Sequence, residues 1–426
     1  MSDTTARELL SRRDRLFGKK TPLFYEDPLH IVRGEGVWLY AADGRRYLDC
    51  YNNVAHVGHC DPTVVAAMTQ QASTLNTHTR YLHENILDYG ERLTATLDGS
   101  ISMVIFVCTG SEANDQALRI ARLHTGGQGV ICTNLTYHGN TTAVAEISPH
   151  GEESNSPNVR TIPFPDSYRP LDGLEGKALS DAYIDKIKAA IQSFEDSGVG
   201  FAGMIVCPIF ANEGLPNLPP EFMKKSVSAV HDAGGLFIAD EVQAGFGRTG
   251  TMWGHEVAGI VPDIVTMGKP MGNGFPLGAV AASAELMQGF RDRVMYFNTF
   301  GGNPIAGAVG NAVLDVMERD KLMENARTTG AYLRDGLAAL AARHPMIGEI
   351  RGHGLWLGIE LVRDSNSLEP ADTEARDIVN RMKERGILIN RIGEHDNVLK
   401  LRPPMPFARE HADLVLENLD TVLGNR

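Results

Sequence analysis

Six short apolar runs, separated by segments with helical patterns, constrain the fold of this chain more than any other feature. They lie between about Asp61 and Ser283, at residues 103–108, 129–133, 203–208, 236–240, 263–268 and 278–283. Continuous runs of Val, Ile and Leu are typical of strands buried on both faces of a largely parallel sheet. The sequence therefore predicts an α/β fold, whose ligands bind beyond the carboxyl ends of the strands.

The last hundred or so residues have a different pattern, in which short strands alternate with helices. This pattern predicts a smaller α+β layer. A hairpin is predicted near the start of the chain, around Asp43 and Gly44, and it should join that layer because isolated hairpins are unstable. We expect an N-terminal segment (1–55) that joins the small domain, a large domain (56–315) and a C-terminal small domain (316–426).

Charge and composition exclude several classes of protein. The chain has 40 Lys and Arg against 53 Asp and Glu, a net charge of −13, which argues against nucleic-acid binding. None of the five cysteines forms a CxxC pair, so we expect reduced thiols and no metal site. No apolar run approaches the ~18 residues of a membrane span, and the first residues lack a signal core. We therefore expect a cytoplasmic protein without membrane contact.

Lys269 and Asp240 are the main candidates for chemistry, because each follows a predicted strand. Their spacing suits one strand–helix–strand crossover, which would place them at the same sheet edge. A buried lysine loses proton affinity and becomes nucleophilic. Pyridoxal phosphate would suit the pair, since its aldehyde binds a lysine amine and its protonated ring nitrogen binds a carboxylate. A plain Asp–Lys ion pair would explain these two residues equally well.

A phosphate site is predicted where Gly110 and Ser111 open a helix after a strand, because free N–H groups there favour anions. An ordinary serine cap is the alternative. Tyr137 and His138 follow the next strand, where the tyrosine ring could stack on a planar cofactor or simply pack. The run 245–250 fits GxGxxG but does not follow its strand directly, and Gly268-Lys269 lacks the rest of a P-loop.

These residues resemble the class III aminotransferases, which are fold type I pyridoxal-phosphate enzymes with a mostly parallel seven-stranded sheet. The resemblance extends from about Leu29 to the C-terminus and is strongest in IADEVQAGFGRTG, PDIVTMGKPMGNGFPLGAV and FNTFGGNP. It implies that Lys269 binds the cofactor aldehyde and that Asp240 pairs with the ring nitrogen. It also implies a set of cofactor-binding residues: Gly110, Ser111, Tyr137, His138, Val242, Gln243 and, from the partner subunit, Thr299. The last role implies a homodimer with shared active sites.

Within the family, NNVAHVGHC, YLHEN and EISP look most like the phospho-lyase branch, which acts on ethanolamine phosphate or phosphorylated hydroxylysine. Ordinary members carry EPxQGE, whose glutamate neutralises a C-terminal arginine. Here the segment is CPIFANEG, so Asn212 takes that position unless a one-residue shift brings Glu213 there. Arg402 would then be free for a dianion.

Four side chains are expected to bind the phosphate of a small phosphorylated amine: Arg402, Lys400, His56 and Arg80. For His56 and Arg80 a structural role is at least as probable. The predicted reaction is elimination of phosphate to give an aldehyde and ammonia. The first alternative is an ω-aminotransferase, which moves an amino group from an amine to a keto acid. The second is a catalytically silent binding protein, which the intact set of cofactor residues argues against.

Overall fold

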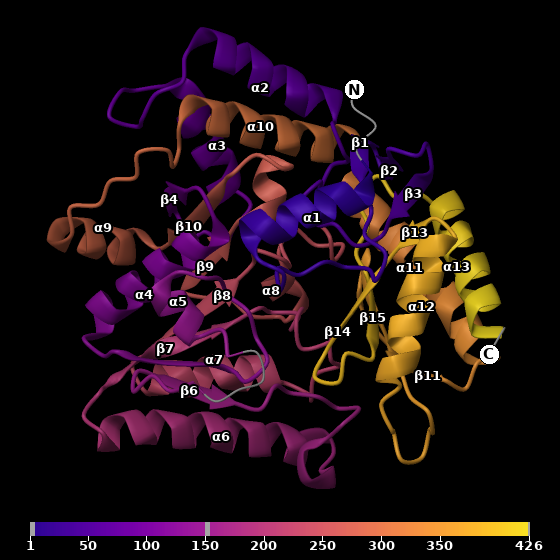
Figure 1. The fold of residues 1–426 in the computed structure, drawn as a ribbon. Helices are drawn as coiled ribbons and strands as arrows, with labels where there is room; N and C mark the ends of the chain where they lie inside the picture. Colours follow the sequence, from indigo (N-terminus) through magenta and orange to yellow (C-terminus); the bar gives the residue numbers. More distant parts are fainter. Residues whose placement is uncertain (1–4, 150–153, 425–426) are drawn as a thin grey trace.

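The computed structural model describes residues 5–149 and 154–424, arranged in a larger and a smaller part (Figure 1). The larger part is built on one seven-stranded sheet. Its strands, in spatial order, are β4 (Met103–Val107), β10 (Gly278–Ala282), β9 (Ile264–Met267), β8 (Leu236–Asp240), β7 (Phe201–Val206), β5 (Gly129–Thr133) and β6 (Val159–Ile162). This arrangement confirms the predicted α/β fold.

All six apolar runs form strands of this sheet, and β6 is the strand that the sequence analysis missed. The neighbours from β9 to β6 pair in parallel, whereas β10 runs antiparallel to both β9 and β4. Five strands, β5, β7, β8, β9 and β10, are buried at every residue. Burial on both faces explains why their sequences are continuously apolar rather than alternating.

Helices cover both faces of the sheet. Apolar residues of α4, α5 and α9 pack on one face, whereas α6 and α7 pack on the other beside α3 and α10. The helices of the described residues are α1 (Ala6–Phe17), α2 (Pro62–Thr74), α3 (Glu84–Thr94), α4 (Gly110–Thr125), α5 (Thr142–Glu146), α6 (Gly176–Asp196), α7 (Phe222–Asp232), α8 (Gly254–Val257), α9 (Ala284–Arg293), α10 (Pro304–Arg319), α11 (Leu322–Ala341), α12 (Asp372–Glu384) and α13 (Arg409–Gly424). Across the described residues, none of them has the length and apolar character that crossing a membrane requires.

The smaller part contains two four-stranded sheets beside α11, α12 and α13 (Figure 1). One sheet has the order β1 (Ile31–Glu35), β2 (Trp38–Ala41), β3 (Arg46–Asp49) and β13 (Ile387–Leu388). The other has the order β11 (Ile347–His353), β12 (Trp356–Leu361), β15 (Val398–Leu401) and β14 (Asn390–Ile392). Parallel pairing of β3 with β13 ties the N-terminal hairpin to the C-terminal region.

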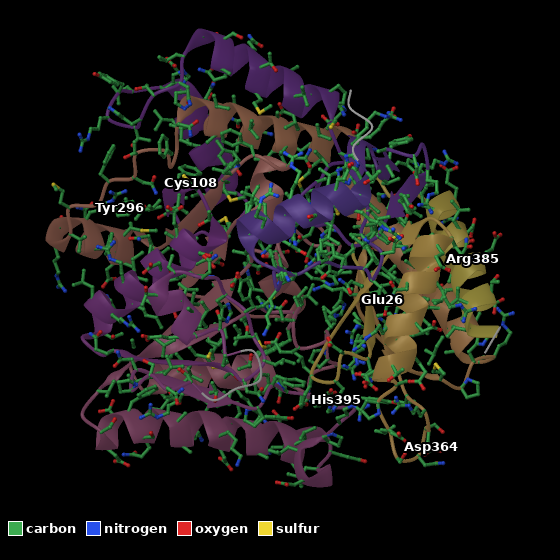
Figure 2. All side chains as sticks on the ribbon, in the orientation of Figure 1. Glu26, Cys108, Tyr296, Asp364, Arg385 and His395 are labelled. Carbon is green, nitrogen blue, oxygen red and sulfur yellow. The ribbon has the colours of Figure 1, made fainter. Side chains whose placement is uncertain are left out.

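One face of the second sheet carries the cationic residues predicted for the substrate. Gly358 on β12 pairs directly with Lys400 on β15. Directly paired residues of an antiparallel ladder share a face, so Trp356, Lys400 and Arg402 lie on one side. Side chains fill the space between the two parts of the molecule (Figure 2).

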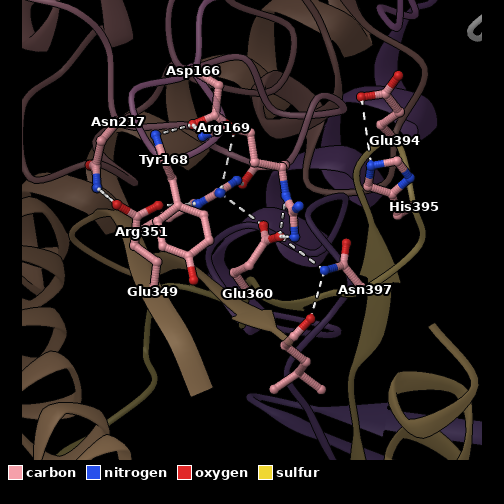
Figure 3. A network of polar contacts seen from close by, with 12 residues as sticks. Asp166, Tyr168, Arg169, Asn217, Glu349, Arg351, Glu360, Glu394, His395 and Asn397 are labelled. Carbon is pink, nitrogen blue, oxygen red and sulfur yellow. Dashed lines mark hydrogen bonds and ion pairs between the residues drawn. The ribbon is translucent and has the colours of Figure 1, made fainter. Parts of the chain in front are cut away.

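Further along the same sheet, a buried ionic network joins the two parts (Figure 3). Arg351 on β11 pairs with Glu360 at 2.8 Å, with Glu349 at 2.6 Å and with Asp166 at 3.4 Å. Arg169, from the same loop as Asp166, pairs with Glu360 at 2.7 Å. Because this loop belongs to the larger part, the network fixes β11 and β12 against it, and β12 in turn positions β15.

Candidate active site

Asp240 and Lys269 come together at the carboxyl edge of the seven-stranded sheet, as their spacing predicts. Asp240 ends β8, and Lys269 follows the neighbouring parallel strand β9 by two residues. Both side chains line a cavity of about 340 Å³. This volume lies within the range of small-molecule sites.

The Lys269 amine is free to react. Within the described part of the chain its Nζ has no hydrogen-bond or ion-pair partner, although it lines the cavity. Burial lowers the pKa of Lys269 below its usual value, Asp240 opposes this shift, and Arg402 adds to it. A lysine with a lowered pKa supplies the neutral amine that nucleophilic or general-base chemistry requires.

The Asp240 carboxylate is held by three donors. Its Oδ2 binds His138 Nδ1 at 2.6 Å and accepts a bond from Asn114 Nδ2 at 3.0 Å, and its Oδ1 accepts from the Val242 N–H at 3.0 Å. Asn114 is positioned in turn by a 2.6 Å bond from the Thr266 hydroxyl. These bonds orient the carboxylate toward the cavity. His138 lines the cavity but acts through Asp240 as a positioning residue.

A glycine-lined cradle lies at the start of α4. Gly110 is the first helical residue, and Ser111 Oγ accepts a bond from the Asn140 N–H at 3.2 Å. A Cβ on Gly139 would lie 2.3 Å from Ser111 Oγ, and the φ of Gly139 is +143°. Only glycine therefore allows this close approach. The free N–H groups of a 16-residue helix face the cavity here and suit a phosphate.

The remaining walls fit a planar cofactor. Val242 is buried and Tyr137 is 38% exposed, and both line the cavity. A Cβ on Gly110 would lie 2.8 Å from two methyl carbons of Val242, so the loop and the valine are in close contact. The donor set fits pyridoxal phosphate: an amine for its aldehyde, a carboxylate for its ring nitrogen and a cradle for its phosphate.

Gln243 connects this cavity with Arg402. Its Oε1 accepts a bond from Arg402 Nη1 at 2.8 Å, and its Nε2 donates to Asn212 Oδ1 at 3.2 Å. Asn212 donates in turn to the carbonyl of Tyr137. Asn212 thus reaches the arginine through Gln243, which agrees with the position expected for it from the EPxQGE pattern. Glu213 turns away and binds the Thr133 hydroxyl at 2.6 Å, so the alternative with a one-residue shift is wrong.

Arg402 is buried, and Asp49 is the acidic residue that raises its pKa against the effect of burial. Among the described residues it forms no ion pair, and its guanidinium lies 5.0 Å and 5.1 Å from the ring centres of Tyr51 and Trp356. Its Nε and Nη2 both donate to the carbonyl of Tyr51. Burial lowers the pKa of Arg402 to about 10, which still leaves it charged at neutral pH.

Two predicted substrate contacts are not available to a ligand. His56 is fully buried, its Nε2 binds the Phe246 carbonyl at 2.6 Å, and Arg248 contacts its Nδ1. Burial and then Arg248 lower its pKa, so the ring is neutral and structural, and the prediction that it binds phosphate is wrong. Lys400 is also buried and donates to the Ala211 carbonyl at 3.2 Å.

The environment of Lys400 also weakens its predicted role as a cation. Burial, followed by the nearby Arg402, lowers the pKa of Lys400 well below its ordinary value. This favours the neutral amine. Its side chain lines neither the cofactor cavity nor the neighbouring cavity that contains Arg402. Arg402, in contrast, lines the neighbouring cavity.

Arg80 and Thr299 lie outside the cavity formed by their own chain. Arg80 is exposed, with its guanidinium 3.9 Å from the ring centre of Phe297. Thr299 is exposed in the same region of the surface. Contact of either residue with a cofactor or substrate requires a second subunit and stays a prediction.

The sequence analysis missed the residues beneath Asp240. Asn114 and Thr266 are fully buried polar residues on α4 and β9, and Thr136 Oγ1 lies 3.0 Å from His138 Nε2. A polar residue on the apolar face of an amphipathic helix was the available signal for Asn114. Its partner could not be read from the sequence, because α4 and β8 are distant along the chain.

Comparisons with known proteins agree with this geometry. The family model described as "Aminotransferase class-III" matches residues 24–423. A Caenorhabditis elegans protein named "Ethanolamine-phosphate phospho-lyase homolog 1" is 38% identical over 435 residues, covering 98% of this chain and 93% of that protein. A Drosophila melanogaster protein named "Alanine--glyoxylate aminotransferase 2-like" is 42% identical over 420 residues, covering 95% and 85%.

Solved structures show the same fold. A phospholyase from Arthrobacter in complex with phosphoethanolamine superposes with a TM-score of 0.95 and 44% sequence identity, covering 98% of this chain and all of that one. A Bacillus anthracis aminotransferase superposes with a TM-score of 0.90 and 29% identity, with full coverage of both chains. The relatives thus carry the names of two activities on one fold.

We expect Gly139→Ala to weaken cofactor binding, because the new Cβ would collide with Ser111 and occupy an unfavourable φ. Backbone strain of about 1–3 kcal/mol corresponds to a roughly 5- to 150-fold higher dissociation constant. Titration of the apoprotein with pyridoxal phosphate, followed by absorption, measures this dissociation constant. Gly99→Ala is the matched control, because nothing lies within 4 Å of its Cβ position. Equal affinities for the two variants would contradict the cradle.

Proposed function

Because this chain belongs to the class III aminotransferases, which depend on pyridoxal phosphate, we propose that it uses the cofactor to eliminate phosphate from ethanolamine phosphate or a related phosphoamine. The observation that carries the proposal is Arg402, a buried cation beside the cofactor cavity whose hydrogen-bond partners among the described residues are neutral. A dianion would supply the missing counter-charge. The similarity to a phospholyase in complex with phosphoethanolamine supports the same substrate class.

The residues divide the proposed chemistry between them. Pyridoxal phosphate, when bound, supplies an aldehyde for the substrate amine and a ring that takes up electrons from the adjacent carbon. Lys269, with its lowered pKa, removes the proton from that carbon. Asp240, fixed by His138 and Asn114, holds the positive charge of the ring nitrogen in place.

Arg402 acts on the leaving group. The bond between carbon and the phosphate oxygen breaks, and its electron pair leaves with phosphate. A cation beside that oxygen stabilises the developing charge. The released enamine takes up water to give acetaldehyde and ammonia, which completes the balance for ethanolamine phosphate.

The alternative function is an ω-aminotransferase, supported by the relatives named aminotransferases. That reaction needs a keto acid and releases no phosphate. The neutral pair formed by Asn212 and Gln243 favours the lyase, because a glutamate there would neutralise Arg402.

Incubation of the holoenzyme with ethanolamine phosphate, without a keto acid, tests the function. We expect equimolar inorganic phosphate and acetaldehyde, and we expect Lys269→Ala to abolish both products. Lys188→Ala, on the exposed face of α6, is the control and should retain the activity. Phosphate release by the Lys269 variant, or none by the wild type with any phosphoamine, would refute the proposal.

Asn212→Glu tests whether Arg402 needs to be free of a counter-charge. The new carboxylate would lie beside Gln243 and compete with the substrate phosphate for Arg402. Loss of about 1.5–3 kcal/mol predicts a KM for ethanolamine phosphate roughly 10- to 150-fold higher. Asn212→Gln has the same length without the charge, so the difference between the variants measures the effect of charge. Equal KM values would place the substrate anion elsewhere.

We also propose a homodimer with shared active sites. An apolar surface supports it, because Leu82 is 96% exposed, Met295 is 98% exposed, and Tyr81 and Phe300 lie exposed in the same two segments. Exposed apolar patches of this kind mark interfaces. Thr299 belongs to this surface, and a second copy would bring it to the phosphate cradle.

Mixed dimers test the sharing of sites. Lys269→Ala inactivates the site of its own chain, whereas Thr299→Asp should repel the cofactor phosphate in the partner's site. Both homodimers should be inactive, but a mixed dimer concentrates both changes in one site and leaves the other intact. Mixing under exchange conditions should therefore restore up to about a quarter of the phosphate release by statistical assortment. Absence of recovery in dimers shown to be mixed would mean that Thr299 acts within its own chain.

A further inference from the structure

A second cavity adjoins the cofactor cavity. It has a volume of about 360 Å³ and is lined by residues of the N-terminal segment together with Arg402. The residues of that segment include Phe24, Leu29, Asn53 and Val54, and Leu388 of β13 also lines the cavity. Val54 lines both cavities, so the two meet at this residue. A ligand with one end at Lys269 could place its other end in the second cavity.

Asn53 lines this cavity and carries an unpaired donor. Its side chain is 3% exposed, and its Nδ2 has no hydrogen-bond partner within the described residues. A buried donor without an acceptor costs about 1–3 kcal/mol, so such atoms indicate a ligand or water that is part of the working site. Two more buried donors near Arg402, the Nε of Arg248 and the Nε1 of Trp356, also lack hydrogen-bond partners within the described residues.

Arg402 has donor capacity left over in the same cavity. A guanidinium has five N–H bonds. Three are used, by two bonds to the Tyr51 carbonyl and one to Gln243, which leaves two. Asp49 also lines the cavity, but its carboxylate is already occupied by His59 at 2.7 Å and by the N–H groups of residues 51 and 52.

We infer that Asn53 is a specificity-determining residue that donates from its side-chain amide to the phosphate of the substrate, next to Arg402. This inference rests on the proposed function. The two free N–H bonds of the guanidinium are enough for the two oxygens of a carboxylate. A phosphate offers a third terminal oxygen to a donor from another segment, whereas a carboxylate would have to share its two oxygens among three donors. Asn53 therefore favours phosphoamines over amino acids.

Asn53→Asp tests the inference in the holoenzyme with saturating cofactor. The isosteric carboxylate repels the phosphate, so we expect the KM for ethanolamine phosphate and the inhibition constant of inorganic phosphate to rise about tenfold or more. The cofactor absorption band, the cofactor affinity and the Tm without phosphate should stay unchanged. Asn53→Leu removes the donor without adding a charge and should show a smaller rise in both constants.

Asn366→Asp is the matched control, since it adds the same charge to an exposed loop. If the wild type releases phosphate but the Asn53 variants keep its KM and inhibition constant, the inference about Asn53 is wrong and the function stands. If no phosphoamine is a substrate, the proposed function fails. In that case the inference about Asn53 is tested by the rise in Tm that inorganic phosphate causes. Loss of this rise in Asn53→Asp but not in Asn366→Asp supports the anion site. Equal rises in Tm for the two variants overturn the inference.

Discussion

Buried positive charge without an acid partner governs the chemistry of this site. Arg402 and Arg248 are both buried, and neither forms an ion pair among the described residues. Burial lowers the pKa of Arg402 to about 10 and that of Arg248 to about 9, so both stay charged at neutral pH. Unpaired buried charge is unfavourable unless a ligand completes it. An anion bound beside Arg402 would offset part of this cost.

The neutral groups around these arginines follow from the same constraint. Gln243 and the Tyr51 carbonyl accept from Arg402, and the neutral ring of His56 contacts Arg248. Each satisfies donors without cancelling the charge. Lys400 differs from the two arginines, because burial and then the nearby Arg402 lower its pKa and favour its neutral form. The sequence showed the cationic residues, but only their packing decides which of them carries charge.

The sequence predicts what depends on local pattern. The six apolar runs identify six strands, and the step from Asp240 to Lys269 places both at one sheet edge. The edge strand β6 could not be predicted in this way, because it has four residues, is only partly buried and therefore lacks a continuous apolar run. Asn114 and Asn53 could not be predicted for another reason. Asn114 binds Asp240, which is distant in the sequence, and Asn53 is notable because its buried Nδ2 has no partner among the described residues. Only the folded structure shows either fact.

Gln243 links the two halves of the site. It lines the cofactor cavity, and its side-chain oxygen accepts from Arg402. This bond couples the guanidinium to a residue beside the cofactor cavity. The strand that carries this arginine pairs with β12, which the Arg351 network anchors to the larger part. Arg402 is thus held in place relative to Lys269, and under the proposed function this spacing would select substrates by the distance between amine and phosphate.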